Sequence, residues 1–141
     1  MKPRIFSACL GLGLGLALIG SSVWAHHSYL LTVQQLMAGL AKAPTPASKG
    51  FFLIDVRSPQ EHVTGVIPGT DLNIDFREIK ARHREIGAKP DDHIVVYCQS
   101  GHRSNIAAET LADLGYRHVY NVQGSMNAWL EAGYTIEPPQ R

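Results

Sequence analysis

Short apolar runs punctuate the chain and predict its strands. Residues 51–54 and 94–97 are continuous apolar stretches, as expected of parallel strands that are buried on both faces. An alternating stretch at 116–122 predicts a further strand, and residues 65–69 and 71–74 are expected to add short ones. The intervals between most of these runs are long enough to hold a helix.

Between the strands, apolar residues recur at helical spacing. The helical segments are 33–43, 75–84, 103–114 and 125–130. Thr32 and Gln35 fit a capping box at the start of the first helix. Asp75 and Ser125 are placed to cap the second and the last. Strands that alternate with helices in this way predict an α/β fold, a small domain with a central parallel sheet of four to five strands and helices on both faces.

The N-terminal segment has the pattern of a secretory signal peptide. Lys2 and Arg4 form a positive start, residues 5–20 are apolar and rich in leucine and glycine, and small residues end at Ala25. We therefore expect residues 1–25 to be cleaved and the protein to be periplasmic or secreted. An uncleaved membrane anchor is the alternative, but the apolar run is short for a membrane span and its glycines weaken it.

The predicted mature chain, residues 26–141, is expected to be a single domain with its core at about 29–134. Removal of the leader takes away Lys2 and Arg4 but no acidic residue, so the formal net charge falls from +1 to −1. A chain without excess positive charge is not expected to bind nucleic acid. After cleavage, no contact with the membrane is expected either.

A cysteine stands where the apolar run 94–97 ends. Loss of the leader also removes Cys9, so Cys98 becomes the only thiol, and a single cysteine cannot form an internal disulfide. It is either buried and inert or retained for chemistry.

The residues that follow Cys98 favour chemistry. They lie at a strand-to-helix turn, where free N–H groups, a glycine and the positive end of a helix dipole stabilise an anion. With Arg103 nearby, these groups are expected to lower the pKa of the thiol and make Cys98 a nucleophile. The loop consists of Cys98, Gln99, Ser100, Gly101, His102, Arg103 and Ser104.

Five motifs in order give the chain a family resemblance. They are Asp55 to His62 (DVRSPQEH), Gly65 to Gly69 (GVIPG), Cys98 to Ser104 (CQSGHRS), Leu114 to Tyr116 (LGY) and Gly124 to Trp129 (GSMNAW). Together they resemble the rhodanese homology domain in its single-domain secreted or periplasmic form, over residues 31–133. One departure is Ser125, which stands where the family often has a second glycine.

The resemblance implies a thiosulfate sulfurtransferase. In that chemistry Cys98 takes a sulfane sulfur from a donor such as thiosulfate, carries it as a covalent persulfide, and passes it to a nucleophile. The acceptor is cyanide in the test tube and a thiol in the cell, with a protein thiol as a further acceptor. Backbone amides of residues 99–103 can stabilise the anions without a metal, so neither a metal nor another cofactor is expected.

The loop arginine and two histidines have less definite roles. Arg103 has two open roles, which are to bind the oxygens of the donor or to fold inward and brace the loop. His102 is expected at the rim of the loop, and His62 is expected to be structural. Neither is needed as a base if the thiol is already ionised.

Three residues of the first motif are expected to support the loop. Asp55 is expected to accept hydrogen bonds from loop amides and not to act as a catalytic base. Arg57 is expected to brace Glu61 or the loop itself.

Two rival functions remain. Cysteine phosphatases and arsenate reductases use a related loop but place one residue more between cysteine and arginine. Here four residues separate Cys98 from Arg103, and Ser104 stands at the phosphatase arginine's position, so a phosphatase is disfavoured. The second rival is a module that carries or binds persulfide without fast turnover.

Overall fold

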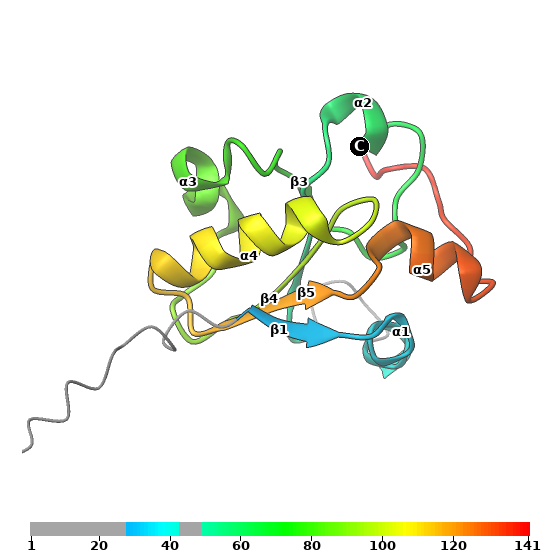
Figure 1. Ribbon diagram of the computed structural model, residues 1–141, viewed down its shortest axis with the longest axis horizontal. Coiled ribbons are helices and arrows are strands. Elements are labelled where there is room, and N and C mark those ends of the chain that lie inside the picture. Colours follow the sequence, from blue (N-terminus) through cyan, green and yellow to red (C-terminus); the bar gives the residue numbers. More distant parts are fainter. Residues whose placement is uncertain (1–27, 43–48) are drawn as a thin grey trace, which may run out of the picture.

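The computed structural model describes residues 28–42 and 49–141, and its centre is a five-stranded parallel sheet (Figure 1). The strands are β1 (Ser28–Leu31), β2 (Phe52–Asp55), β3 (Leu72–Asn73), β4 (His93–Tyr97) and β5 (His118–Val122). Their order in the sheet is β1-β5-β4-β2-β3, and every neighbouring pair is parallel. The predicted α/β fold is confirmed, with β4 in the middle of the sheet.

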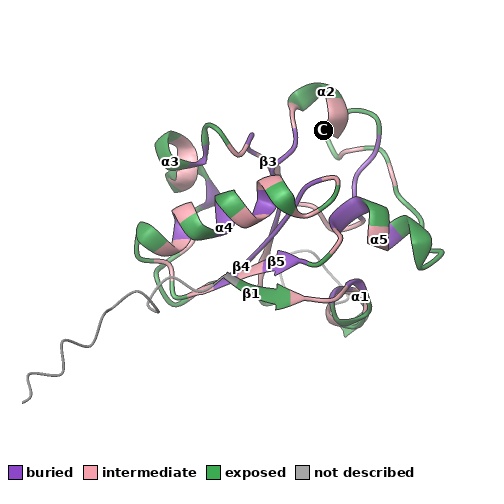
Figure 2. Cartoon of the chain, in the orientation of Figure 1, coloured by how far each residue is buried: buried purple, intermediate pink, exposed green. Residues whose placement is uncertain are grey.

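Helices cover both faces of the sheet. They are α1 (Val33–Lys42), α2 (Pro59–His62), α3 (Ile79–Arg82), the 3₁₀ helix η3 (His83–Ile86), α4 (His102–Asp113) and α5 (Ser125–Glu131). One core cluster packs α3, η3 and α4 against the sheet, and a second packs α1 and α5 against the opposite face. As a consequence, most of the central strand β4 is buried, whereas β1 at the edge of the sheet is exposed (Figure 2).

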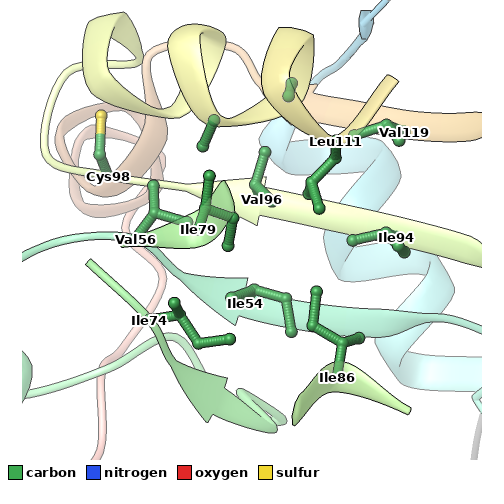
Figure 3. Close-up of a cluster of buried hydrophobic side chains, with 12 residues drawn as sticks. Ile54, Val56, Ile74, Ile79, Ile86, Ile94, Val96, Cys98, Leu111 and Val119 are labelled. Atoms are coloured by element: carbon green, nitrogen blue, oxygen red, sulfur yellow. The ribbon is translucent and has the colours of Figure 1, made fainter. Parts of the chain in front are cut away.

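Alternation along β4 decides which layer receives the cysteine. Ile94 and Val96 belong to the core cluster beneath α4, whereas Val95 and Tyr97 belong to the cluster beneath α1 and α5. Cys98 continues the first set and lies at the end of that cluster where α4 begins (Figure 3). The strand therefore delivers the thiol beneath the first turn of α4.

The first helix forms as predicted, and the strand before it was missed. The Thr32 N–H donates to Gln35 Oε1 at 2.9 Å, and the Gln35 N–H donates to Thr32 Oγ1 at 3.1 Å, which confirms the capping box. Residues 28–31 form the edge strand β1, which pairs with β5. An edge strand is stabilised by pairing with a partner distant in sequence, which the strand's own pattern does not show.

The segment after β3 differs from the predicted helix over residues 75–84. It forms only the short helix α3 followed by the 3₁₀ turn η3, with Glu78 at the N-cap of α3. The Asp75 carboxylate does not cap that helix, since it accepts hydrogen bonds from the Arg77 backbone and guanidinium. An arginine two residues away is the stronger local partner for the carboxylate.

Predictions for residues 1–27, including the signal peptide, and for the loop residues 43–48 lie outside the described residues. In the part of the chain that is described, no helix is long and apolar enough to cross a membrane.

Two aspartate–arginine turns of the same geometry follow neighbouring strands. In each, the aspartate Oδ1 accepts from the backbone N–H and Nε of the arginine two residues on, and Oδ2 accepts from Nη2. Asp55 and Arg57 make the first turn after β2, and Asp75 and Arg77 make the second after β3. The Arg57 side chain is 3% exposed, whereas that of Arg77 is 71% exposed.

This matched pair predicts unequal costs for removing the two arginines. Arg57→Met leaves the Asp55 carboxylate buried without its main counter-charge, so the free energy of unfolding should fall by about 3–5 kcal/mol. Arg77→Met removes an exposed counter-charge and lets water reach the Asp75 carboxylate, so the loss should be clearly smaller than that for Arg57→Met. Urea unfolding with unchanged m-values measures both. Equal losses would contradict the prediction.

Candidate active site

The site is built around the buried sulfur of Cys98, at the end of the central strand. Cys98 is a free cysteine with no exposed surface. Its Sγ accepts hydrogen bonds from the Gly101 N–H at 3.1 Å and from Ser104 Oγ at 3.3 Å. Gly101 has φ = 100°, a left-handed conformation that favours glycine and turns its amide back toward the sulfur.

These donors determine the ionisation of the thiol. Burial by itself would raise the pKa of Cys98, but the Ser104 hydroxyl and the backbone amides of Ser104, Gly101 and Ser100 lower it below its ordinary value. The predicted direction of the pKa shift is therefore confirmed. The hydroxyl of Ser104 is the largest of these favourable contributions, although sequence reasoning gave that role to the amides and Arg103.

The start of α5 holds the backbone of the cysteine loop. The Met126 N–H donates to the Cys98 carbonyl at 3.1 Å, and the Asn127 N–H donates to the Gln99 carbonyl at 2.9 Å. The Gln99 side chain adds a bond from Nε2 to Asn127 Oδ1 at 2.6 Å. Ser125 accepts the Cys98 N–H on its Oγ at 3.1 Å, so both backbone polar groups of Cys98 are bonded to α5.

Ser125 was predicted to cap α5, and that prediction is wrong. Gly124 is the N-cap, and Ser125 is the first residue of the helix, fully buried and with φ = 48°. Its Oγ accepts the Cys98 N–H and donates to the Val122 carbonyl at 3.0 Å. It is the one non-glycine residue with positive φ in the described ranges, which is a strained conformation of the kind found at functional sites.

Asn121 is a site residue that sequence reasoning missed. It is 4% exposed, and its Nδ2 donates to the Gly101 carbonyl at 3.1 Å. Its Oδ1 accepts from Ser104 Oγ at 2.6 Å. In the sheet Asn121 pairs with Val96, so the β5 register places it beside the strand that ends at Cys98. The sequence shows a polar residue two positions after Val119, on the same face of the predicted strand, but the partners of Asn121 depend on the register with β4.

Arg103 and Glu61 form an ion pair across the mouth of the loop. The guanidinium donates to both carboxylate oxygens, at 2.8 Å and 2.7 Å. This arrangement, with help from Ser58, lowers the pKa of Glu61 to about 2. Ser58 also forms a capping box with Glu61 at the start of α2. Of the two roles considered for Arg103, the one that this structure shows is the brace.

Arg57 makes different contacts from those predicted. It bonds to Asp55 and donates from Nη2 to the Gly65 carbonyl at 2.7 Å. Arg57 was expected to brace either Glu61 or the cysteine loop, but these side-chain bonds go to neither, and the partner of Glu61 is Arg103 from α4. Asp55 accepts the backbone N–H of Arg57, not an amide of the cysteine loop, and also contacts His62 Nδ1 at 2.9 Å.

The remaining residues of the cysteine loop differ in their exposure. Ser100 and His102 are exposed at the rim of the loop, Gln99 is half-buried, and Ser104 is buried. Trp129 is fully buried in the core. Within residues 28–42 and 49–141, no group of three or more His, Cys, Asp or Glu side chains is arranged to hold a metal ion.

The lowered pKa of Cys98 predicts reactivity below the ordinary thiol range. Alkylation of folded protein by iodoacetamide, followed at the Cys98 peptide by mass spectrometry, should show a midpoint below about 8.5. Ser104→Ala should raise that midpoint because it removes the strongest donor to the thiolate. The same chain unfolded in urea is the control, and a midpoint shared by folded and unfolded protein would contradict the prediction.

The strained backbone at Ser125 predicts an unusual order of stability. Ser125→Ala and Ser125→Gly both remove the bond to the Cys98 N–H, so both should destabilise the protein by about 1–3 kcal/mol. Alanine keeps the cost of a left-handed φ, so Ser125→Ala should be the less stable by about 1 kcal/mol. Glycine normally weakens helices more than alanine, and that normal order in urea unfolding would refute the argument.

Comparison with known proteins agrees with this site. The sequence pattern of the rhodanese-like domain matches residues 32–132. Thiosulfate sulfurtransferase PspE of Escherichia coli is 41% identical over 75 residues, which cover 50% of this chain and 67% of that protein. Human thiosulfate:glutathione sulfurtransferase is 38% identical over 91 residues, covering 56% of this chain and 78% of its own.

A solved structure gives the same result for the fold. The rhodanese-related protein of Thermoplasma volcanium superposes with a TM-score of 0.63 at 28% sequence identity, over 77% of this chain and 97% of that one. The similarities to sulfurtransferases support a sulfurtransferase family for this chain. By the span of the match and the shared architecture, the chain belongs to the family of rhodanese-like domains.

Proposed function

We propose that this protein is a sulfurtransferase that moves a sulfane sulfur from a donor such as thiosulfate to a nucleophilic acceptor through a persulfide on Cys98. The observation that carries the proposal is the sulfur itself, which faces an amide and a hydroxyl donor that favour its thiolate. A thiolate is the form of cysteine that attacks sulfur.

The first half-reaction follows from this geometry. The Cys98 thiolate attacks the sulfane sulfur of thiosulfate, a new S–S bond forms, and the bond to the sulfonate sulfur breaks. Sulfite leaves with the electron pair of the broken bond. The persulfide then carries its negative charge on the outer sulfur, where the loop amides and the N-terminus of α4 provide positive potential.

The second half-reaction returns the enzyme to its starting state. A thiolate or cyanide attacks the outer sulfur, and the bond to Cys98 Sγ breaks so that Cys98 leaves as a thiolate. The donors that lower the pKa of Cys98 also make it a better leaving group. The reaction needs no resident cofactor, because the persulfide is the only intermediate that the enzyme carries.

The charges around the loop indicate how the donor is held. Glu61 occupies the guanidinium of Arg103 with both oxygens, so Arg103 supports the loop and leaves most of the contact with the donor to backbone amides. His102 is exposed at the rim and can add a positive charge when protonated. We propose that the donor and acceptor are small molecules or protein thiols in an exported compartment.

The phosphatase alternative lacks a residue that its chemistry requires. Ser104, at the position of the phosphatase arginine, is fully buried and directs its hydroxyl at Cys98 and Asn121. A phosphoryl group would find no guanidinium at that point of the loop.

The test is turnover from thiosulfate and cyanide to thiocyanate. The protein is expected to produce thiocyanate by ping-pong kinetics, and Cys98→Ser is expected to abolish it. Thr110→Ala is the matched control, because it removes a hydroxyl of α4 that donates to the Ile106 carbonyl, outside the cysteine loop, and leaves the nucleophile in place.

Intact mass separates the remaining outcomes. If Cys98 gains one sulfur atom but no thiocyanate is produced, the protein is a persulfide carrier and the proposed turnover is wrong. Neither turnover nor added sulfur, with phosphate released from an aryl phosphate, would overturn the proposal in favour of a phosphatase.

A further inference from the structure

The hydroxyl of Ser104 has one proton and two acceptors within reach. Ser104 Oγ lies 2.6 Å from Asn121 Oδ1 and 3.3 Å from Cys98 Sγ. A hydroxyl donates only one hydrogen bond of full strength, so it cannot serve both acceptors at once. All three groups are buried, where water does not supply a substitute donor.

The neighbouring groups leave Ser104 as the donor to the amide oxygen. Asn121 Nδ2 donates to the Gly101 carbonyl at 3.1 Å, which fixes the amide so that Oδ1 faces Ser104. Ser125 Oγ, 3.3 Å from Ser104 Oγ, donates its proton to the Val122 carbonyl at 3.0 Å. It accepts the Cys98 N–H on its other side. The proton of Ser104 is thus divided between Asn121 and the sulfur.

We propose that Asn121 is a positioning residue that competes with the Cys98 sulfur for the proton of Ser104 and thereby limits how strongly the thiolate is stabilised. When the sulfur is a thiolate, the full negative charge attracts the O–H toward Sγ, because hydrogen bonds to charged acceptors are the stronger ones. When the sulfur carries no charge, the short bond to Asn121 prevails. The hydroxyl follows the charge on the sulfur by rotation about one bond.

Within the catalytic cycle this competition has a definite direction, which rests on the proposed sulfurtransferase function. In the persulfide the negative charge lies on the outer sulfur, so Sγ becomes a weak acceptor and Ser104 returns to Asn121. As the acceptor attacks and Sγ leaves with the electron pair, the growing charge draws the hydroxyl back. Between the two half-reactions Asn121 thus accepts the hydrogen bond of the Ser104 hydroxyl. By competing for that hydroxyl it also keeps the Cys98 thiolate from becoming too stable to attack the donor.

A double-mutant cycle tests the competition. The pH midpoint of Cys98 alkylation is measured in the wild-type chain, in Asn121→Leu, in Ser104→Ala and in the double variant. Asn121→Leu should lower the midpoint when Ser104 is present, because the freed hydroxyl donates to sulfur alone. Alkylation at a pH below the midpoint should then be roughly 3- to 10-fold faster than in the wild-type chain.

The background without the hydroxyl isolates this effect. In Ser104→Ala, Asn121→Leu also removes the bond to the Gly101 carbonyl but has no proton to release, so it should not lower the midpoint. Equal shifts in the two backgrounds, or no shift in either, would overturn the proposal and leave Asn121 as a tether of the loop. Asn121→Ala in the same backgrounds gives the same test if leucine prevents folding.

The readout is independent of sulfur transfer. Alkylation needs no donor or acceptor of sulfane sulfur, so a protein that fails to make thiocyanate can still show the coupling. Conversely, active protein without the coupling would refute the role of Asn121 and leave the proposed function standing.

Discussion

The site depends on one constraint, which is that the proposed function requires a negative charge on a buried sulfur. Cys98 has no exposed surface, and burial alone would favour its neutral form. The charge is tolerated because an amide from the loop and a hydroxyl from α4 point at the sulfur. Those donors hold their places only because α5 and β5 bind the backbone of the same loop.

The order of the strands makes this arrangement possible. Cys98 leaves the central strand β4, whose neighbours are β5 and β2. From the β5 side come Asn121 and the turn into α5, which hold the loop from behind. From the β2 side comes Glu61, which fixes Arg103 across the mouth. Strands adjacent to β4 therefore support the loop from two directions, as ligand sites at the carboxyl edge of parallel sheets generally do.

Most of the fold and the nucleophile could be predicted from local signals, and the misses have physical causes. Residues 51–54 and 94–97 are short apolar runs, and they form most of β2 and β4. The edge strand β1 and the site residue Asn121 depend on register across the sheet, which a local pattern does not contain. Which residues pair across the sheet is decided when distant strands come together, so it could not be predicted from the run that contains each residue.

Ser125 illustrates a second kind of miss. Serine before a helical pattern is a good N-cap, and the one signal against that role was the glycine that the family often has at this position, which fits the φ of 48°. The structure places it one residue inside the helix, because Gly124 takes the cap and the hydroxyl is needed by the Cys98 amide. Local preference and tertiary demand conflict there, and conflicts of this kind concentrate at functional sites.

The division of labour between the cation and the hydroxyl follows from how each responds to charge. Arg103 is permanently charged and fixed by Glu61, so it favours an anion equally in every state of the cycle. In the proposed cycle a fixed positive charge stabilises both the attacking thiolate of the first half-reaction and the leaving thiolate of the second, so it slows the first step while it favours the second. The Ser104 hydroxyl can donate where the charge is and withdraw where it is not. A movable neutral donor with Asn121 as its second acceptor is thus better suited than the arginine to a sulfur that, in the proposed cycle, loses its charge once and regains it once in each turnover.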